Sequence, residues 1–270
     1  MDRSALKYLL SKYHIKPRRE SGQNFLVNDL MVKKLIDSAE LTKDDTVLEI
    51  GPGLGALTPD LCAQAKRVLA VELDRNFLPI LKNLSGVNKN LEVINSDIFK
   101  VNFKEIGLNN FKIVSSLPYN ITSLVFRYFL ETGPRPQLMA VIVQKEVAER
   151  ICAKPGHHTL LSLSVQLFGE PKIAHIIPRD DFQPVPEVDS AILLIKNIKQ
   201  PENIKDIKKF FQLLRVGFSA KRKKLSNNLQ NGLKLDKKQV EKMLISAKLN
   251  SNCRAQELSL KDWILLFDQL

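Results

Sequence analysis

The fold is decided by one stretch of the chain, Val47-Leu48-Glu49-Ile50-Gly51-Pro52-Gly53-Leu54-Gly55. It begins as an apolar strand, turns through glycines and leads into residues 56–65, which have the pattern of a helix. Glycines in such a turn let the backbone approach a ligand closely, and the N-terminus of the following helix favours an anionic group. The stretch therefore predicts a nucleotide-type ligand at the end of a parallel strand.

Two acidic residues stand at the ends of the next two expected strands. Glu72 lies 19 residues after Gly53, where a carboxylate can accept hydrogen bonds from both hydroxyls of a ribose. Asp97 follows the third strand, where it could accept a hydrogen bond from an adenine amine. Because Gly51, Gly53 and Ala56 also fit the dinucleotide fingerprint, these residues alone leave an NAD(P)-dependent dehydrogenase as an alternative.

Strand-like and helix-like segments alternate over the first two thirds of the chain. Strands are expected at residues 46–50, 67–73, 91–95, 112–117, 139–144, 172–177 and 191–195, and helices at 4–13, 28–39, 56–65, 76–84, 122–131 and 145–153. This alternation predicts a doubly wound α/β fold with a mostly parallel sheet of about seven strands. The last two strands have no clear helix between them, which favours a terminal antiparallel pair.

After residue 197 the pattern contains helices only, expected at 204–215, 237–249 and 260–270. Two of them begin with the spacing of a capping box, Asp236 with Gln239 and Ser259 with Asp262. We therefore predict two domains. Residues 1–198 would form the ligand-binding sheet domain with a basic N-terminal extension, and residues 199–270 a small all-helical domain.

The net charge of +12 is concentrated at the two ends of the 270-residue chain. Residues 198–270 contain 16 Lys and Arg against 7 Asp and Glu, and residues 1–20 contain 6 against 2, so the stretch between them is nearly neutral. This distribution is typical of an enzyme that binds a polyanion, although solvated lysines alone would give the same counts. The three cysteines are scattered, and no signal or membrane-spanning segment is evident. We expect a cytoplasmic protein with no metal and no membrane contact.

Ser116-Leu117-Pro118-Tyr119 follows the fourth expected strand, at the sheet edge where ligands bind. An exocyclic adenine amine is a weak nucleophile because its lone pair is delocalised into the ring. Hydrogen-bond acceptors that hold its N–H groups can direct that lone pair towards a methyl donor. The Ser116 hydroxyl and the Leu117 carbonyl would supply two acceptors, Pro118 would fix the turn, and Tyr119 could stack on the base. The motif favours amine methylation over hydride transfer.

Together these motifs resemble the ribosomal RNA adenine dimethyltransferase family, in its small-subunit KsgA type. The matching pieces span most of the chain: Gly22-Gln23-Asn24-Phe25-Leu26, Glu49 to Gly55, Val71 to Asp74, Asp97, Leu117-Pro118-Tyr119-Asn120, Gln144-Lys145-Glu146, Phe182-x-Pro184-x-Pro186-x-Val188-x-Ser190 and Arg222-Lys223-x-Leu225. The resemblance implies a Rossmann-like seven-stranded methyltransferase sheet with S-adenosylmethionine as cofactor. It also implies dimethylation of the N6 amines of two adjacent adenosines near the 3′ end of 16S rRNA.

The resemblance implies roles for individual residues. Those expected at the cofactor are Asn24, Leu26, Gly51, Gly53, Glu72, Asp97 and Ser116. Those expected at the target adenine are Ser116, Leu117, Pro118, Tyr119 and Phe182, with the Phe182 ring stacked on the second face of the base. The family usually has asparagine where this chain has Ser116. Because serine offers one acceptor oxygen on a shorter arm, we hypothesise a slower reaction or a reaction that stops at the monomethyl product.

Lys221-Arg222-Lys223-Lys224 leads into the helical domain. Four consecutive cations suit contacts with phosphates, although a solvated basic helix start would have the same sequence. The resemblance implies that they contact RNA, and that the protein acts as a monomer on small-subunit rRNA within a pre-30S particle. Two alternatives share the fold: a large-subunit rRNA adenine methyltransferase of the Erm type and a non-catalytic ribosome-assembly factor.

Overall fold

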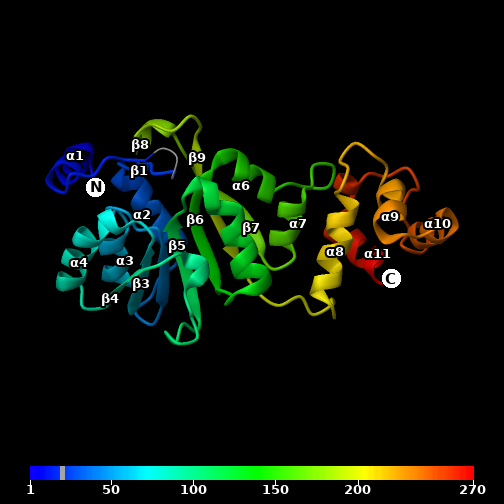
Figure 1. The fold of residues 1–270 in the computed structure, drawn as a ribbon, viewed down its shortest axis with the longest axis horizontal. Coiled ribbons are helices and arrows are strands. Elements are labelled where there is room, and N and C mark those ends of the chain that lie inside the picture. Colours follow the sequence, from blue (N-terminus) through cyan, green and yellow to red (C-terminus); the bar gives the residue numbers. More distant parts are fainter. Residues whose placement is uncertain (19–21) are drawn as a thin grey trace. The chain divides into compact units, whose positions relative to one another are not determined.

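The computed structural model describes residues 1–18 and 22–270, and its first compact unit is built on a seven-stranded sheet (Figure 1). The strands of this sheet are β2 (Thr46–Ile50), β3 (Arg67–Glu72), β4 (Leu91–Asn95), β5 (Phe111–Ser116), β6 (Leu138–Gln144), β7 (Glu170–Ile177) and β9 (Ser190–Lys196). Their order is β4-β3-β2-β5-β6-β9-β7. Strands β2 to β6 pair in parallel, and β9 is antiparallel to both β6 and β7. The predicted doubly wound sheet and its antiparallel end are both confirmed.

The helices of this unit flank the sheet and are α1 (Arg3–Lys12), α2 (Asp29–Ser38), α3 (Thr58–Gln64), α4 (Leu78–Val87), α5 (Thr122–Arg127) and the first part of α6 (Lys145–Ile151). Helix α2 packs on β6 and β7, whereas α3 and α4 pack on β3 and β4. The Asn28 side chain begins α2 as expected, because it accepts hydrogen bonds from the N–H groups of Leu30 and Met31. Strands β6 and β9 are buried along almost their whole length, as expected for strands covered on both faces.

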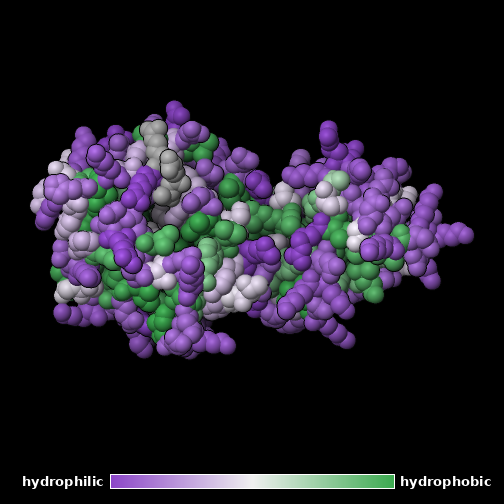
Figure 2. Space-filling model, in the orientation of Figure 1, coloured by the Kyte–Doolittle hydropathy of each residue, from purple (hydrophilic) through white to green (hydrophobic). Residues whose placement is uncertain are grey.

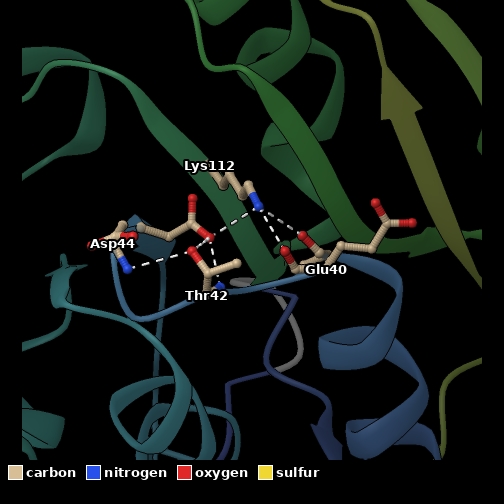
Figure 3. Close-up of polar contacts among 6 residues, drawn as sticks. Glu40, Thr42, Asp44 and Lys112 are labelled. Atoms are coloured by element: carbon tan, nitrogen blue, oxygen red, sulfur yellow. Dashed lines mark hydrogen bonds and ion pairs between the residues drawn. The ribbon is translucent and has the colours of Figure 1, made fainter.

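The order of the strands reverses between β2 and β5, and the two ends of this strand pair are held differently. At the amino end, the Lys112 ammonium donates to the carbonyls of Ala39 and Glu40 at 3.2 and 2.8 Å and to Asp45 Oδ2 at 3.0 Å (Figure 3). The hydroxyl and N–H of Thr42 bond the same carboxylate oxygen. All three N–H groups of the Lys112 ammonium are used in these contacts, so this end of the strand pair is held by structural hydrogen bonds and the carboxyl end is left for ligands.

The second compact unit contains residues 149–169 and 199–270. Its helices are the end of α6, α7 (Leu160–Gln166), α8 (Ile207–Gly217), α9 (Leu225–Leu233), α10 (Lys237–Ser246) and α11 (Leu260–Phe267). The two capping boxes expected from the sequence are present at the starts of α10 and α11. Residues 149–169 belong to this second unit, whereas the expected division at residue 198 placed them with the sheet. The N–H groups of Gly156 and His158 bond the Gln256 carbonyl, and Phe168 stacks on Phe211, so this segment packs with the C-terminal helices.

Besides α7, which lies where the sequence predicted no helix, two short strands and one helix were not expected. The two-residue strands β1 (Phe25–Leu26) and β8 (Phe182–Gln183) form a separate antiparallel pair. Helix α9 is rich in asparagine and glycine, which are weak helix formers.

Within the described residues, no helix is long and apolar enough to cross a membrane. The side of the helical unit seen in Figure 2 is mainly hydrophilic.

Candidate active site

A cavity of about 690 Å³ lies at the carboxyl ends of β2, β3, β4 and β5. Five segments that are far apart in the sequence line it: residues 22–26, 49–53 with 56–57, 71–77, 96–99 and 116–121, together with Arg18. All of the residues expected at the cofactor line this one cavity, as do Leu117, Pro118 and Tyr119. The structure therefore brings together the glycine turn, both acidic residues and the Ser116-Leu117-Pro118-Tyr119 motif at the place where the strand order reverses.

Three glycines let these segments approach one another. Gly22, Gly51 and Gly53 all have left-handed backbone conformations, with φ of 68°, 66° and 56°. A Cβ atom at Gly53 would lie 3.3 Å from Cε1 of Phe25, and one at Gly22 would lie 3.2 Å from the backbone nitrogen of Tyr119. The N-terminal segment thus lies directly against the glycine turn and against the turn that carries Tyr119.

The Glu72 carboxylate is fixed by the backbone around it. Its Oε2 accepts from the Gly53 N–H at 2.9 Å and its Oε1 from the Asp74 N–H at 2.8 Å. Burial raises the pKa of Glu72, while these two backbone N–H groups oppose that shift. Each oxygen keeps a second lone pair, so the carboxylate can still accept hydrogen bonds from a pair of hydroxyls.

Asp97 and Asn24 reach the cavity from two different sides. Asp97 caps the short turn after β4, where its Oδ1 accepts from the Phe99 N–H at 3.0 Å. Asn24 precedes β1, and its Nδ2 donates to the Gly22 carbonyl at 3.4 Å. The neighbouring Gln23 donates from Nε2 to Asp74 Oδ2 at 3.1 Å. This last contact ties the N-terminal segment to the residues that follow Glu72.

Ser116 ends β5, and the next three residues turn across the carboxyl end of the sheet. The Leu117 N–H donates to the Ile142 carbonyl at 3.1 Å, and the Thr122 hydroxyl donates to the Pro118 carbonyl at 3.2 Å. Ser116 and Tyr119 are half-buried, and both line the cavity. The Tyr119 hydroxyl lies 2.7 Å from Ser190 Oγ, and burial raises the pKa of this phenol.

Ser115 opens the sheet next to this turn, a role that the sequence did not indicate. The regular pairing of β2 with β5 covers only Thr46 to Leu48. Beyond it the buried Ser115 hydroxyl accepts from the Ile50 N–H at 3.2 Å and donates to the Ile50 carbonyl at 2.5 Å. One side chain thus replaces the backbone ladder, so the two strands can diverge with their polar groups satisfied.

Glu49 is a further carboxyl group of the cavity lining, and its sequence position alone indicated no role for it. It lines the cavity but is almost fully buried, and its Oε2 accepts from the Thr58 hydroxyl at 2.8 Å. Burial, with a smaller contribution from the charge of Glu72, raises the pKa of Glu49 to about 8. A protonated Glu49 can donate a hydrogen bond as well as accept one.

The structure contradicts the expected position of Phe182. Its side chain is 1% exposed and packs in the hydrophobic core, because β8 pairs with β1 and sets Phe182 opposite Leu26. It does not line the cavity, and a ring so buried has no free face on which a base could stack. Tyr119, in contrast, lines the cavity, so a base bound there could stack on its ring.

The four cations Lys221, Arg222, Lys223 and Lys224 are all exposed in the turn between α8 and α9. The Lys223 N–H bonds the Ala220 carbonyl at 3.1 Å, and the Lys224 ammonium bonds Asn252 Oδ1 at 2.7 Å. The turn therefore has a defined backbone and a cluster of positive charge facing solvent. Among residues 1–18 and 22–270, no group of three or more His, Cys, Asp and Glu side chains could hold a metal ion.

Known proteins match this chain over nearly its whole length. The ribosomal RNA small subunit methyltransferase A of Dehalococcoides mccartyi strain ATCC BAA-2266 is 40% identical over 96% of this chain and 90% of its own length. The protein of the same name from Latilactobacillus sakei is 38% identical over 98% of this chain and 93% of its own.

Two crystal structures have the same fold. The dimethyladenosine transferase from Plasmodium falciparum superposes with a TM-score of 0.75 and 25% identity, over 90% of this chain and 95% of its own. The 23S rRNA methyltransferase ErmE superposes with a TM-score of 0.73 and 26% identity, over 91% of this chain and 99% of its own. Residues 15–270 match the family described as ribosomal RNA adenine dimethylase. The chain, with its Rossmann-like methyltransferase sheet, belongs to the ribosomal RNA adenine dimethylase family.

Proposed function

We propose that this protein dimethylates the N6 amines of two adjacent adenosines near the 3′ end of 16S rRNA, using S-adenosylmethionine, during assembly of the small ribosomal subunit. One observation carries the proposal: the acidic residues suited to a nucleoside and the Ser116-Leu117-Pro118-Tyr119 turn suited to an adenine amine line one cavity. The small-subunit target follows the names of the relatives at 38–40% identity.

The residues of the cavity fit S-adenosylmethionine. The glycine turn leaves space that a side chain would occupy, because a Cβ atom added at Gly51 would lie 3.4 Å from Pro118 Cγ. Glu72 would accept hydrogen bonds from the ribose hydroxyls and Asp97 from the adenine amine, while Asn24 and Leu26 would cover the ligand. S-adenosylmethionine supplies an activated methyl group. The protein supplies the position of that group relative to the target amine.

The target adenine would lie against Tyr119, with its N6 amine at Ser116 and the Leu117 carbonyl. Two acceptors would hold both N–H groups and direct the lone pair out of the ring plane towards the methyl donor. The amine becomes acidic only after methyl transfer, so its proton can leave without a strong base in the site. To reach the cavity, the adenine must leave its stack in the RNA.

The proposal also covers the RNA substrate, the oligomeric state of the enzyme and its location in the cell. The exposed turn at residues 221–224 would contact phosphates, and the substrate would be 16S rRNA within a pre-30S particle. We propose that the protein acts there as a monomer, in the cytoplasm. Its similarity to ErmE keeps a large-subunit target as the second candidate, because the two proteins share the whole fold.

Nucleoside mass spectrometry separates these functions. Unmethylated small subunits and isolated large subunits are each incubated with the protein and S-adenosylmethionine. We expect N6,N6-dimethyladenosine in the small-subunit RNA only. Product in the large-subunit RNA only would instead support the second candidate function, methylation of large-subunit rRNA. Cofactor binding without any methylated nucleoside would favour a non-catalytic assembly factor.

A further inference from the structure

We propose that Ser190 is a positioning residue of the active site: its hydroxyl holds the phenol of Tyr119 and fixes the ring on which the target adenine stacks. This inference rests on the function proposed above. It begins from a contact between two residues that are 71 positions apart in the sequence, with 2.7 Å between the Tyr119 hydroxyl and Ser190 Oγ.

Ser190 is held rigidly. It is fully buried at the start of β9, where it is paired with Gln144 of β6 on one side and with Ile177 of β7 on the other. The residue before it is fixed as well, because the Asp189 carbonyl accepts from the Lys145 N–H at 3.0 Å and its Oδ1 from the Arg179 N–H at 3.1 Å. The Ser190 hydroxyl is therefore presented from the interior of the sheet.

Tyr119 has no comparable support from its own backbone. It begins a three-residue 3₁₀ turn after Pro118, outside the sheet, and it is one of the residues that line the cavity. A tyrosine side chain turns about two bonds, and a hydrogen bond at the far end of the ring restrains both. Burial raises the pKa of the phenol, which keeps it protonated and able to form this bond.

The need for this restraint follows from the position of Phe182. Because Phe182 is buried in the core, it cannot stack on the base opposite Tyr119, so the position of the base depends on the Tyr119 ring. A ring free to turn would leave the amine misplaced relative to the methyl donor, and small misplacements lower the rate of the chemical step strongly. The phenol bonds β9, which is three strands away from β2 in the sheet, so its loss should not disturb the glycine turn or Glu72.

The test combines a double-mutant cycle with a spectroscopic measurement. Ser190→Ala and Tyr119→Phe each remove one partner of the bond and keep the aromatic ring. We expect each to lower kcat about 5-fold, the usual size of one lost hydrogen bond, with the Kd of S-adenosylmethionine unchanged. The double variant should resemble either single variant rather than show the product of both effects. Ser164→Ala, which removes a largely buried hydroxyl from the helical unit, is the matched control.

The fluorine NMR spectrum of protein labelled with 3-fluorotyrosine reports the ring without any activity. The chain has four tyrosines, and the Tyr119 signal is the one lost in Tyr119→Phe. We expect Ser190→Ala to shift or broaden that signal alone. Each of three results would overturn the inference. They are an unchanged Tyr119 signal in Ser190→Ala, additive effects of the two substitutions on kcat, and an unchanged kcat in Tyr119→Phe. If the wild-type enzyme makes no methyladenosine, the proposed function fails, while the NMR comparison still decides the contact. If Ser190→Ala does not fold, Tyr119→Phe tests the same bond from the other side.

Discussion

At the scale of single residues, Glu72 combines two tasks that depend on the same carboxylate. It bonds the N–H groups of Gly53 and Asp74, and it faces the cavity as the expected ligand of a ribose. Its charge-assisted hydrogen bonds are stronger than those of a neutral group. The residue should therefore contribute more to cofactor affinity than any neutral side chain of the site.

We expect Glu72→Gln to weaken the binding of S-adenosylmethionine about 30- to 100-fold, because an amide keeps only one acceptor oxygen and loses the negative charge. Isothermal titration calorimetry measures this change. Glu105→Gln, at an exposed position outside the cavity, is the matched control. An affinity within 3-fold of wild type would show that Glu72 only supports the backbone turn.

Glu49 should make stability depend on pH. Its folded-state pKa of about 8 lies above its ordinary value of 4.5, so it contributes most below pH 4.5 and the contribution is lost as the pH rises through 8. We expect Glu49→Gln to exceed wild type in free energy of unfolding by roughly 2–4 kcal/mol at pH 8.5, and to match it near pH 4.5. Urea denaturation across this range measures the difference. A difference that stays constant from pH 4.5 to 8.5 would mean that Glu49 titrates normally.

Ser116 stands where the family resemblance implies an asparagine, and we expect Ser116→Asn to increase both the rate and the proportion of N6,N6-dimethyladenosine. The longer asparagine side chain would bring an acceptor oxygen closer to the amine. Time-resolved nucleoside mass spectrometry separates the monomethyl from the dimethyl product. Ser123→Asn, at an exposed serine of α5, is the control. Unchanged rates and product ratios would show that serine is sufficient at this position.

At the scale of secondary-structure elements, the approach of the N-terminal segment to the Tyr119 turn depends on Gly22. We expect Gly22→Ala to lower both cofactor affinity and kcat several-fold, because its Cβ would lie 3.2 Å from the Tyr119 nitrogen. Gly107→Ala is a matched control: Gly107 has nearly the same φ of 66°, but a Cβ there meets no atom within 4 Å. Equal effects of the two substitutions on kcat would mean that backbone strain, and not the contact, is responsible.

The sequence predicted the long elements and missed features that depend on distant partners. The strands from β2 to β6 were predictable because apolar runs alternate with helices, and Glu72 and Asp97 follow from their place at strand ends. The strands β1 and β8 contain two residues each, too few for any periodicity, and their pairing is what buries Phe182. Ser115 and Ser190 could not be assigned, since a buried serine acquires a role only from the groups that the fold places beside it.

At the scale of the whole molecule, the cavity and the basic turn proposed to contact RNA belong to different units. The lysines of the turn at residues 221–224 belong to the helical unit, whereas the cavity belongs entirely to the sheet unit. Substitutions in one unit can therefore be tested for effects on the other. The separation also means that salt should weaken RNA binding with little effect on the cofactor.

We expect Lys223→Glu combined with Lys224→Glu to weaken RNA binding at least 10-fold and to reduce the slope of log Kd against log salt by about 1.5–2, because two phosphate contacts are lost. Cofactor affinity should not change. Fluorescence anisotropy at several salt concentrations gives the slope. Lys82→Glu with Lys89→Glu makes the same change of charge at exposed positions of the sheet unit, and an equal effect there would indicate a non-specific response to net charge.

The Ser115 hydroxyl that separates β2 from β5 also makes one amide of the protein a natural reporter. The amide of Ile50, a residue that lines the cavity, is bonded to the buried side chain of Ser115, while the neighbouring residues of β2 are held by the backbone ladder. The Ile50 amide hydrogen should exchange with solvent through a local opening of the crevice, whereas the neighbouring amide hydrogens of β2 should exchange only when the whole sheet opens. Deuterium uptake at this single position would then measure how often the empty enzyme opens its site, and how far cofactor binding suppresses that opening.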